Sequence, residues 1–175
     1  MDNIIKPFII FAFLGFTGEN IKNWNSPDFL PCNPIFKYYL SEKVCFVPLL
    51  PVYGFGGLFI AYMYQYKNTI PWYVRMIIYA VVFNFIELLG GYIGEEYVCN
   101  KIDTCYAGNK LWHYDGNYTV DGYVDIPHTI YWMIAGLLGE QFYGYFKDQS
   151  YTTLLSLMLT IWTLISVLRS KKTNK

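Results

Sequence analysis

Long apolar runs are the feature that most constrains how this chain can fold. A helix needs about 20 mostly apolar residues to cross the hydrocarbon core of a bilayer. We expect five such helices, at about residues 4–19, 48–66, 72–93, 126–146 and 151–168. The first is short for a span and needs a locally thinner bilayer. The sequence therefore predicts an all-α, polytopic transmembrane bundle of about five spans, forming a single membrane domain over residues 1–175.

The composition agrees with a membrane protein. Hydrophobic residues make up 54% of the chain, charged residues only 15%, and the mean hydropathy is +0.24. Acidic and basic residues balance at 13 each, so the chain has no net positive field that would attract nucleic acid. The lipid bilayer is the expected partner, and no nucleic acid is expected.

The first apolar run resembles a signal peptide in one respect, because Lys6 precedes a short apolar core. We favour a retained helix, since no convincing small-x-small cleavage site follows and a cleaved leader would not need Glu19 at its end. Cleavage would leave four spans.

Two long polar loops, residues 20–43 and 95–125, separate the expected spans. With five spans, both loops and the C-terminal tail share one side of the membrane. That side carries nine basic residues, Lys22, Lys37, Lys43, Lys101, Lys110, Arg169, Lys171, Lys172 and Lys175. The other side carries four, Lys6, Lys67, Arg75 and Lys147. Because loops rich in Lys and Arg stay in the cytosol, we expect a multi-pass protein with cytosolic long loops and tail.

The cysteines point to the opposite orientation. Cys32 and Cys45 lie in or beside the first loop, Cys99 and Cys105 lie in the second, and Asn117 begins the glycosylation sequon NYT. An even number of cysteines and a sequon would suit a lumenal side. We keep the orientation based on charge, because Lys and Arg placement acts directly during insertion. In that orientation the cysteines stay reduced and the sequon is unused.

Two glutamates lie in or beside apolar helices. Glu19 ends the first run, and Glu87 shares a helical face with Gly91 and Gly94, at i, i+4 and i+7. That face should contact another helix and not lipid. A glutamate this deep either belongs to a functional site or is a protonated acid that hydrogen-bonds a neighbouring helix, and the sequence leaves both readings open.

The second span begins with an unusual run of prolines and glycines, Pro48, Pro51, Gly54, Gly56 and Gly57. Proline removes backbone donors and glycine relaxes the backbone. We therefore expect a broken helix start that faces the interior of the bundle, because irregular backbone is not tolerated against lipid.

Motifs of common enzymes are missing from the sequence. It has no Walker A loop, no G-x-S-x-G elbow and no H-E-x-x-H helix. Cys99, Cys105 and His113 carry zinc-type donors, but not at the spacing of a common zinc site. No local signature supports a Cys–His nucleophile. We expect no metal and no cofactor, assign no catalytic residue, and favour a protein that is not an enzyme.

A set of polar residues remains near one membrane face: Glu19, Glu87, Glu95, His113, Asp115 and His128. Closely spaced acids suit proton relay, cation coordination or general acid work. We interpret three further acids as solvated loop charges, Glu96, Asp121 and Asp125. Three aromatic residues are interpreted as anchors at the membrane interface, Trp112, Tyr114 and Trp132.

Three ordered motifs cover most of the chain up to about Gly139. FLGFTGE has a Gly-aromatic-x-x-Glu pattern at Gly15, Phe16 and Glu19. PLLPVYGFGG has a Pro-x-x-Pro-x-Tyr-Gly-x-Gly pattern at Pro48, Pro51, Tyr53, Gly54 and Gly56. The third set is Glu87, Glu95, Trp112, Tyr114, Asn117, Gly122 and Trp132. In this order the motifs resemble those of the CmpB-type family of type IV ABC-transporter permeases.

The resemblance implies an integral membrane, permease-like protein. Its partners would be a separate ATPase or membrane subunit, or a second copy of the chain. The sequence departs from the family where a Trp-Asp-Tyr motif is usual, because Trp112 and Tyr114 flank His113 here. A role for that Asp would need His113 or the shifted Asp115.

Our leading hypothesis is a permease-like transporter subunit in which Glu19, Glu87 and Glu95 line a polar interior. Two alternatives stay open. One is a membrane-embedded enzyme that acts on a lipid-linked substrate, and the other is a membrane scaffold without catalysis.

Overall fold

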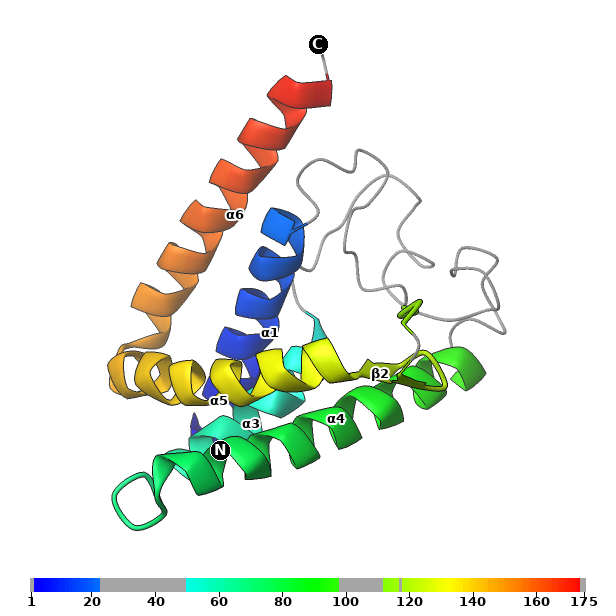
Figure 1. Cartoon of the computed structure of the whole chain (residues 1–175). Coiled ribbons are helices and arrows are strands. Elements are labelled where there is room, and N and C mark those ends of the chain that lie inside the picture. Colours follow the sequence, from blue (N-terminus) through cyan, green and yellow to red (C-terminus); the bar gives the residue numbers. More distant parts are fainter. Residues whose placement is uncertain (1, 23–49, 98–111, 117, 174–175) are drawn as a thin grey trace. The chain divides into compact units, whose positions relative to one another are not determined.

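The computed structural model describes residues 2–22, 50–97, 112–116 and 118–173. These residues form five α-helices and one short two-stranded hairpin, which confirms the expected all-α class (Figure 1). The chain divides into two compact units, Met1–Leu58 with Gly144–Lys175, and Phe59–Tyr143. Pro48, Asn117 and the four cysteines lie outside the described residues, so the inferences about them stay predictions.

The helices follow the expected apolar runs closely. They are α1 (Asp2–Lys22), α3 (Pro51–Tyr64), α4 (Trp72–Tyr97), α5 (Ile126–Phe146) and α6 (Tyr151–Thr173). The bounds of α5 are those expected, whereas α1, α4 and α6 continue into polar residues beyond their apolar runs. In the described part of the chain one helix, Trp72–Glu96 with 25 residues, is long and apolar enough by length and composition to cross a membrane.

The first unit packs aromatic side chains of α1 against α3. Phe11, Phe13 and Phe16 of α1 are buried. Glycines of α3 lie under two rings of α1, because a Cβ at Gly54 would lie 2.7 Å from the ring of Phe8 and a Cβ at Gly57 would collide with Phe11. Small residues thus let the two helices approach closely.

The α3 helix corrects one prediction. A broken backbone was expected across Pro48, Pro51 and the glycines. Pro48 lies outside the described residues, but Pro51–Tyr64 is a continuous α-helix. Pro51 is its first residue, where the missing N–H would have no partner within the helix in any case. The glycines serve close packing and do not interrupt the helix.

A lysine of α1 ties the first unit together at one end. Lys6 Nζ donates hydrogen bonds to the backbone oxygens of Lys147 and Gln149, at 3.0 and 2.9 Å. The ammonium group also lies 5.1 Å from the centre of the Tyr151 ring. These carbonyls belong to the turn after α5, so Lys6 satisfies acceptors that follow the end of a helix.

The second unit is built on α4 and α5, which run side by side (Figure 1). They are antiparallel, because Tyr79 near the start of α4 contacts Glu140 near the end of α5, whereas Asn84 further along α4 contacts Thr129. Gly136 of α5 lies directly under the Tyr79 ring, where a Cβ would collide with it.

A short hairpin connects to the start of α5. Strands β1 (Thr119–Val120) and β2 (Val124–Asp125) pair antiparallel. Asp121 and Gly122 form the turn with φ values of 51° and 74°. Two positive φ values in succession are typical of the tight turns that Asp-Gly favours. The hairpin was not expected from sequence, and it brings Tyr123 onto Gly91 of α4.

Candidate functional site

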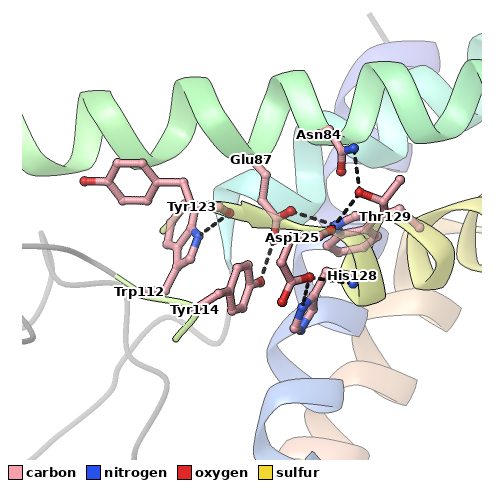
Figure 2. A network of polar contacts seen from close by, with 9 residues as sticks. Asn84, Glu87, Trp112, Tyr114, Tyr123, Asp125, His128 and Thr129 are labelled. Carbon is pink, nitrogen blue, oxygen red and sulfur yellow. Dashed lines mark hydrogen bonds and ion pairs between the residues drawn. The ribbon is translucent and has the colours of Figure 1, made fainter. Parts of the chain in front are cut away.

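A line of polar side chains runs between α4 and α5 inside the second unit, and we call it the polar seam. Its members are Arg75, Tyr79, Asn84, Glu87, Thr129, Trp132 and Glu140. Glu87 is the carboxylate of the polar seam whose two oxygens both accept hydrogen bonds (Figure 2). Its Oε1 accepts a hydrogen bond from the Tyr114 hydroxyl at 2.7 Å, and its Oε2 accepts one from Trp132 Nε1 at 2.8 Å. Only 4% of Glu87 is exposed, so both oxygens exchange water for protein donors.

Tyr114 and Trp132 were expected to anchor the membrane interface, and their polar atoms instead hold Glu87. The prediction that Glu87 faces another helix is confirmed, because Trp132 belongs to α5. Gly91, one turn further along the same face of α4, is covered by Tyr123. The bond to Tyr114 shows that the polar loop also reaches this carboxylate.

Asp125 and His128 lie at the start of α5, next to Tyr114, which bonds Glu87. The His128 ring stacks on Tyr114 with centroids 3.9 Å apart. Asp125 Oδ1 accepts a hydrogen bond from the His128 backbone N–H at 2.7 Å and lies 2.7 Å from His128 Nδ1. Asp125 therefore caps the N-terminus of α5. The interpretation of Asp125 as a solvated loop charge is wrong, because only 12% of its side chain is exposed.

Asn84 and Thr129 form the middle of the polar seam. Asn84 Nδ2 donates to Thr129 Oγ1 at 2.8 Å, and Thr129 Oγ1 donates to the backbone oxygen of Asp125 at 2.7 Å (Figure 2). Within the described residues the buried Asn84 Oδ1 has no hydrogen-bond partner. The Asn84–Thr129 contact thus links α4 to the capped start of α5.

The opposite end of the polar seam holds a buried ion pair that the sequence did not reveal. Arg75 Nε lies 3.0 Å from Glu140 Oε1, and the two residues are 7% and 1% exposed. The Tyr79 hydroxyl donates to the same oxygen at 2.7 Å. Arg75 also donates to the backbone oxygens of Lys67 and Ile70, so it organises the turn before α4. A buried charge pair is stable only when such additional hydrogen bonds are made.

A sequence signal for Glu140 did exist. Glu140 follows Gly136 and Gly139 with the same spacing that Glu19 has after Gly15 and Gly18. No comparable signal joins Arg75 to Glu140, because the two residues are far apart in the chain and Arg75 was counted only among the basic residues on one side of the membrane.

Glu95 is held where α4 meets the hairpin. Its Oε2 accepts a hydrogen bond from the Tyr123 hydroxyl, and Trp112 Nε1 donates to the Tyr123 backbone oxygen at 3.1 Å. Burial first, and then the hydrogen bond to Glu95, raise the pKa of the Tyr123 hydroxyl above its ordinary range. Tyr123 therefore stays a hydrogen-bond donor over the physiological pH range.

The structure groups the predicted site residues in separate places. Glu87 and Glu95 lie on α4 in the second unit, each with its own donors. Glu19 belongs to the first unit, where it accepts a hydrogen bond from the Tyr53 hydroxyl at 2.5 Å. A compartment shared by Glu19 and Glu87 stays a prediction. His113 Nε2 lies 3.3 Å from Asp115 Oδ1 at an exposed position, so these two are paired apart from Glu95.

Several described residues of the three sequence motifs have local packing roles. Gly15 lies under the Tyr53 ring, Gly56 is buried in α3, and Gly122 lies against the His113 ring. The Tyr114 backbone N–H donates to the Gly122 oxygen at 2.9 Å. His113 therefore packs on the hairpin turn, at the position where the Trp-Asp-Tyr pattern has an acid.

In the part of the chain that the structure describes, no group of three or more His, Cys, Asp or Glu residues is placed to hold a metal ion. What the polar seam offers is hydrogen-bonding and charge chemistry: one carboxylate held by neutral donors, and one paired with arginine. Such groups can hold a proton or orient a polar ligand.

Comparison with known proteins identifies one family. Residues 7–170 match the family described as "Putative ABC-transporter type IV". No curated protein and no solved structure matches the chain.

Proposed function

Since this chain belongs to the family described as "Putative ABC-transporter type IV", we propose that it is a multi-pass, permease-like membrane subunit whose helix carboxylates line a polar interior. One observation carries the proposal. The face of α4 that holds Glu87 is polar and buried, while the opposite face is apolar and exposed.

The exposed face of α4 suits contact with lipid. Large apolar side chains repeat every four residues along it, at Tyr73, Ile77, Val81, Phe85 and Leu89, and each is at least 46% exposed. A similar stripe follows α5, at Ile126, Ile130, Ile134, Leu138 and Phe142. A core helix of a soluble protein is mostly buried, whereas only 22% of the apolar window of α4 is buried. Water is a poor solvent for such faces, and acyl chains are a good one.

A contact within the first unit suits the five-span topology. Lys6 lies against the turn that contains Lys147, so these two basic residues share one end of the first unit. An even number of crossings between them is needed, and the helices α1, α3, α4 and α5 supply four. In this arrangement the long loops and the C-terminal tail lie in the cytosol, where their basic residues favour them.

A separate ATPase is the partner that this function requires. The sequence contains no Walker A loop, so the chain does not supply the energy of ATP hydrolysis itself. The family description supports an assembly in which another subunit does so. Purification from the native membrane, followed by identification of the subunits that accompany the chain, tests for this partner.

The role of Glu87 is tested by proton flux. The protein, purified with its native membrane partners, is reconstituted into proteoliposomes that contain a pH-sensitive dye. We expect Glu87→Gln to abolish the flux or to change its dependence on pH strongly, because the amide cannot exchange a proton. Glu96→Gln is the matched control, since it is the same substitution at an exposed position of the same helix.

Two outcomes would overturn the proposal. Flux through Glu87→Gln that equals wild-type flux at every pH would remove Glu87 from the function. A wild-type preparation without flux, in which both variants also keep the wild-type cellular phenotype, would favour the scaffold alternative.

A further inference from the structure

A five-residue pattern, Gly-x-x-Gly-Glu, occurs three times in this chain. The copies are GFTGE from Gly15 on α1, GYIGE from Gly91 on α4 and GLLGE from Gly136 on α5. Their glutamates are Glu19, Glu95 and Glu140. Each copy is helical, so the first glycine and the glutamate lie on one face, one turn apart.

In each copy a tyrosine from another element covers the first glycine. Tyr53 of α3 lies on Gly15, Tyr79 of α4 lies on Gly136, and Tyr123 of the hairpin lies on Gly91. At all three glycines a Cβ would collide with the tyrosine ring. The absence of a side chain is therefore a steric requirement of each contact.

The same three tyrosines donate hydrogen bonds to the glutamates of the same copies. Tyr53 bonds Glu19 Oε1 at 2.5 Å, and Tyr79 bonds Glu140 Oε1 at 2.7 Å. The third bond joins the Tyr123 hydroxyl to Glu95 Oε2. In every copy, the same tyrosine therefore packs its ring on the glycine and donates its hydroxyl hydrogen bond to the glutamate.

Helix geometry explains why this spacing works. A side chain on an α-helix leans toward the N-terminus, so a glutamate covers the turn that precedes its own Cα. That turn begins at the first glycine of the pattern. One turn rises about 5.4 Å, which is close to the distance from the Cβ of a tyrosine to its hydroxyl oxygen. A tyrosine packed on the glycine therefore reaches the carboxylate without displacing the helix that carries the glutamate or the element that carries the tyrosine.

We propose that Gly-x-x-Gly-Glu with its tyrosine is a single positioning device used three times, which we call the tyrosine clasp. Tyr53, Tyr79 and Tyr123 are positioning residues that fix the carboxylates of Glu19, Glu140 and Glu95. The device adds Glu140 to the carboxylates of the polar interior, and to that extent it rests on the proposed function. Glu87 lies outside it, because Glu87 precedes Gly91 and has different donors.

The clasp itself is tested by a double-mutant cycle on Tyr79→Phe and Glu140→Gln. Thermal unfolding of the detergent-solubilised protein is measured for wild type, both single variants and the double variant. We expect each single variant to lower the Tm, and the double variant to lower it by clearly less than the sum. Additive effects would overturn the clasp at this copy. Tyr131→Phe is the control, because Tyr131 is 63% exposed on α5.

The glycine requirement is tested in the first copy on α1. Gly15→Ala should lower the Tm by about 2–10 °C, since its Cβ meets the Tyr53 ring. Gly18→Ala is a matched control three residues away, where a Cβ would meet nothing within 4 Å, and its Tm should stay at or above the wild-type value. Equal losses in the two variants would overturn the steric argument.

Positioning is separated from mere stabilisation by the infrared carboxylate bands of the purified protein. Among the described residues, the charged and titratable groups that contact Glu140 are Arg75 and Tyr79. If Tyr79 positions Glu140, Tyr79→Phe shifts the band that Glu140→Gln removes, whereas a purely structural role lowers the Tm and leaves that band in place. An unmoved band would overturn the positioning role.

Failure of the clasp and failure of the proposed function give different results. The double-mutant cycle needs no transport, so coupling without any flux in wild type would leave the clasp intact and remove the permease function. The infrared bands need no transport either, so the positioning role is tested in the same way whether or not the wild type carries a flux.

Discussion

The two ends of the polar seam bury the same functional group in different ways. Near the start of α4, Glu140 is paired with a cation, Arg75, and accepts one tyrosine hydroxyl. Near the polar loop, Glu87 accepts hydrogen bonds from a tyrosine and a tryptophan, and no lysine or arginine of the described residues pairs with it. Both carboxylates are nearly inaccessible, at 1% and 4% exposed.

The difference indicates which carboxylate keeps one charge state and which can gain or lose a proton. Removing Arg75 would leave a buried carboxylate without a counter-ion, so the Arg75–Glu140 end is committed to one charge state. Glu87 depends on neutral donors, and one of them, Tyr114, comes from a loop segment. A proton can therefore be added or lost at the Glu87 end without breaking an ion pair, which is the property that the proposed function needs.

The largest effect is expected for Arg75→Met. This change leaves Glu140 buried and unpaired and removes the donor to the Lys67 and Ile70 carbonyls. Breaking one partner of a buried pair costs about 3–5 kcal/mol. Thermal or denaturant unfolding in detergent measures the loss. The double variant Arg75→Met with Glu140→Gln is the control and should recover much of it, and a single variant as stable as wild type would refute the committed ion pair.

Smaller effects are expected for Tyr114→Phe and Trp132→Phe at the other end. Each removes one donor from Glu87 and leaves a buried carboxylate oxygen unsatisfied, which costs about 1–3 kcal/mol. Tyr114→Phe keeps an aromatic ring that can stack on His128. The same unfolding measurement applies, with Tyr131→Phe as a control within about 0.5 kcal/mol of wild type. If these variants lost as much free energy of unfolding as Arg75→Met, the two ends of the polar seam would not differ in how they stabilise their carboxylates.

The helices could be predicted from the sequence because their signal is local. Apolar runs of about 20 residues predict α5 at its observed bounds and α4 at its observed start, and Glu87 was identified as an acid in such a run. The five-span topology stays a prediction. The α3 glycines were misread as a break because glycine has two uses, a relaxed backbone and close packing, and the choice depends on rings of α1.

The partners of the carboxylates could not be predicted, because they come from distant segments. Trp132 is 45 residues from Glu87, and Glu140 is 61 residues from Tyr79. Asp125 directly precedes the expected start of α5, so the sequence contained the signal for a capping residue, but Asp125 was counted with the loop charges. Sequence alone identified Glu87 as a carboxylate that needs hydrogen-bond partners, but the tertiary structure determines which groups bond to it.

The smallest effect concerns Tyr123, which extends the comparison to the loop end of α4. Its pKa is raised above the ordinary value of 10.0 by burial and by its bond to Glu95. The folded protein therefore keeps this proton at a pH where the unfolded chain loses it. The unfolded state then binds fewer protons, so stability falls as the pH rises above about 10. Below that pH the contribution is fully present.

Thermal unfolding of wild type and Tyr123→Phe across this pH range measures the effect. We expect the wild-type Tm to fall more steeply than that of the variant above pH of about 10, because the variant has no hydroxyl to ionise in its unfolded state. The Tm difference between wild type and variant at neutral pH serves as the internal reference, because the Tyr123 hydroxyl is then protonated in both the folded and the unfolded state. Parallel curves of Tm against pH for the two proteins would mean that the Tyr123 hydroxyl does not bond Glu95 as described. Glu95 would then differ from Glu87 and Glu140, which both accept hydrogen bonds in the polar seam.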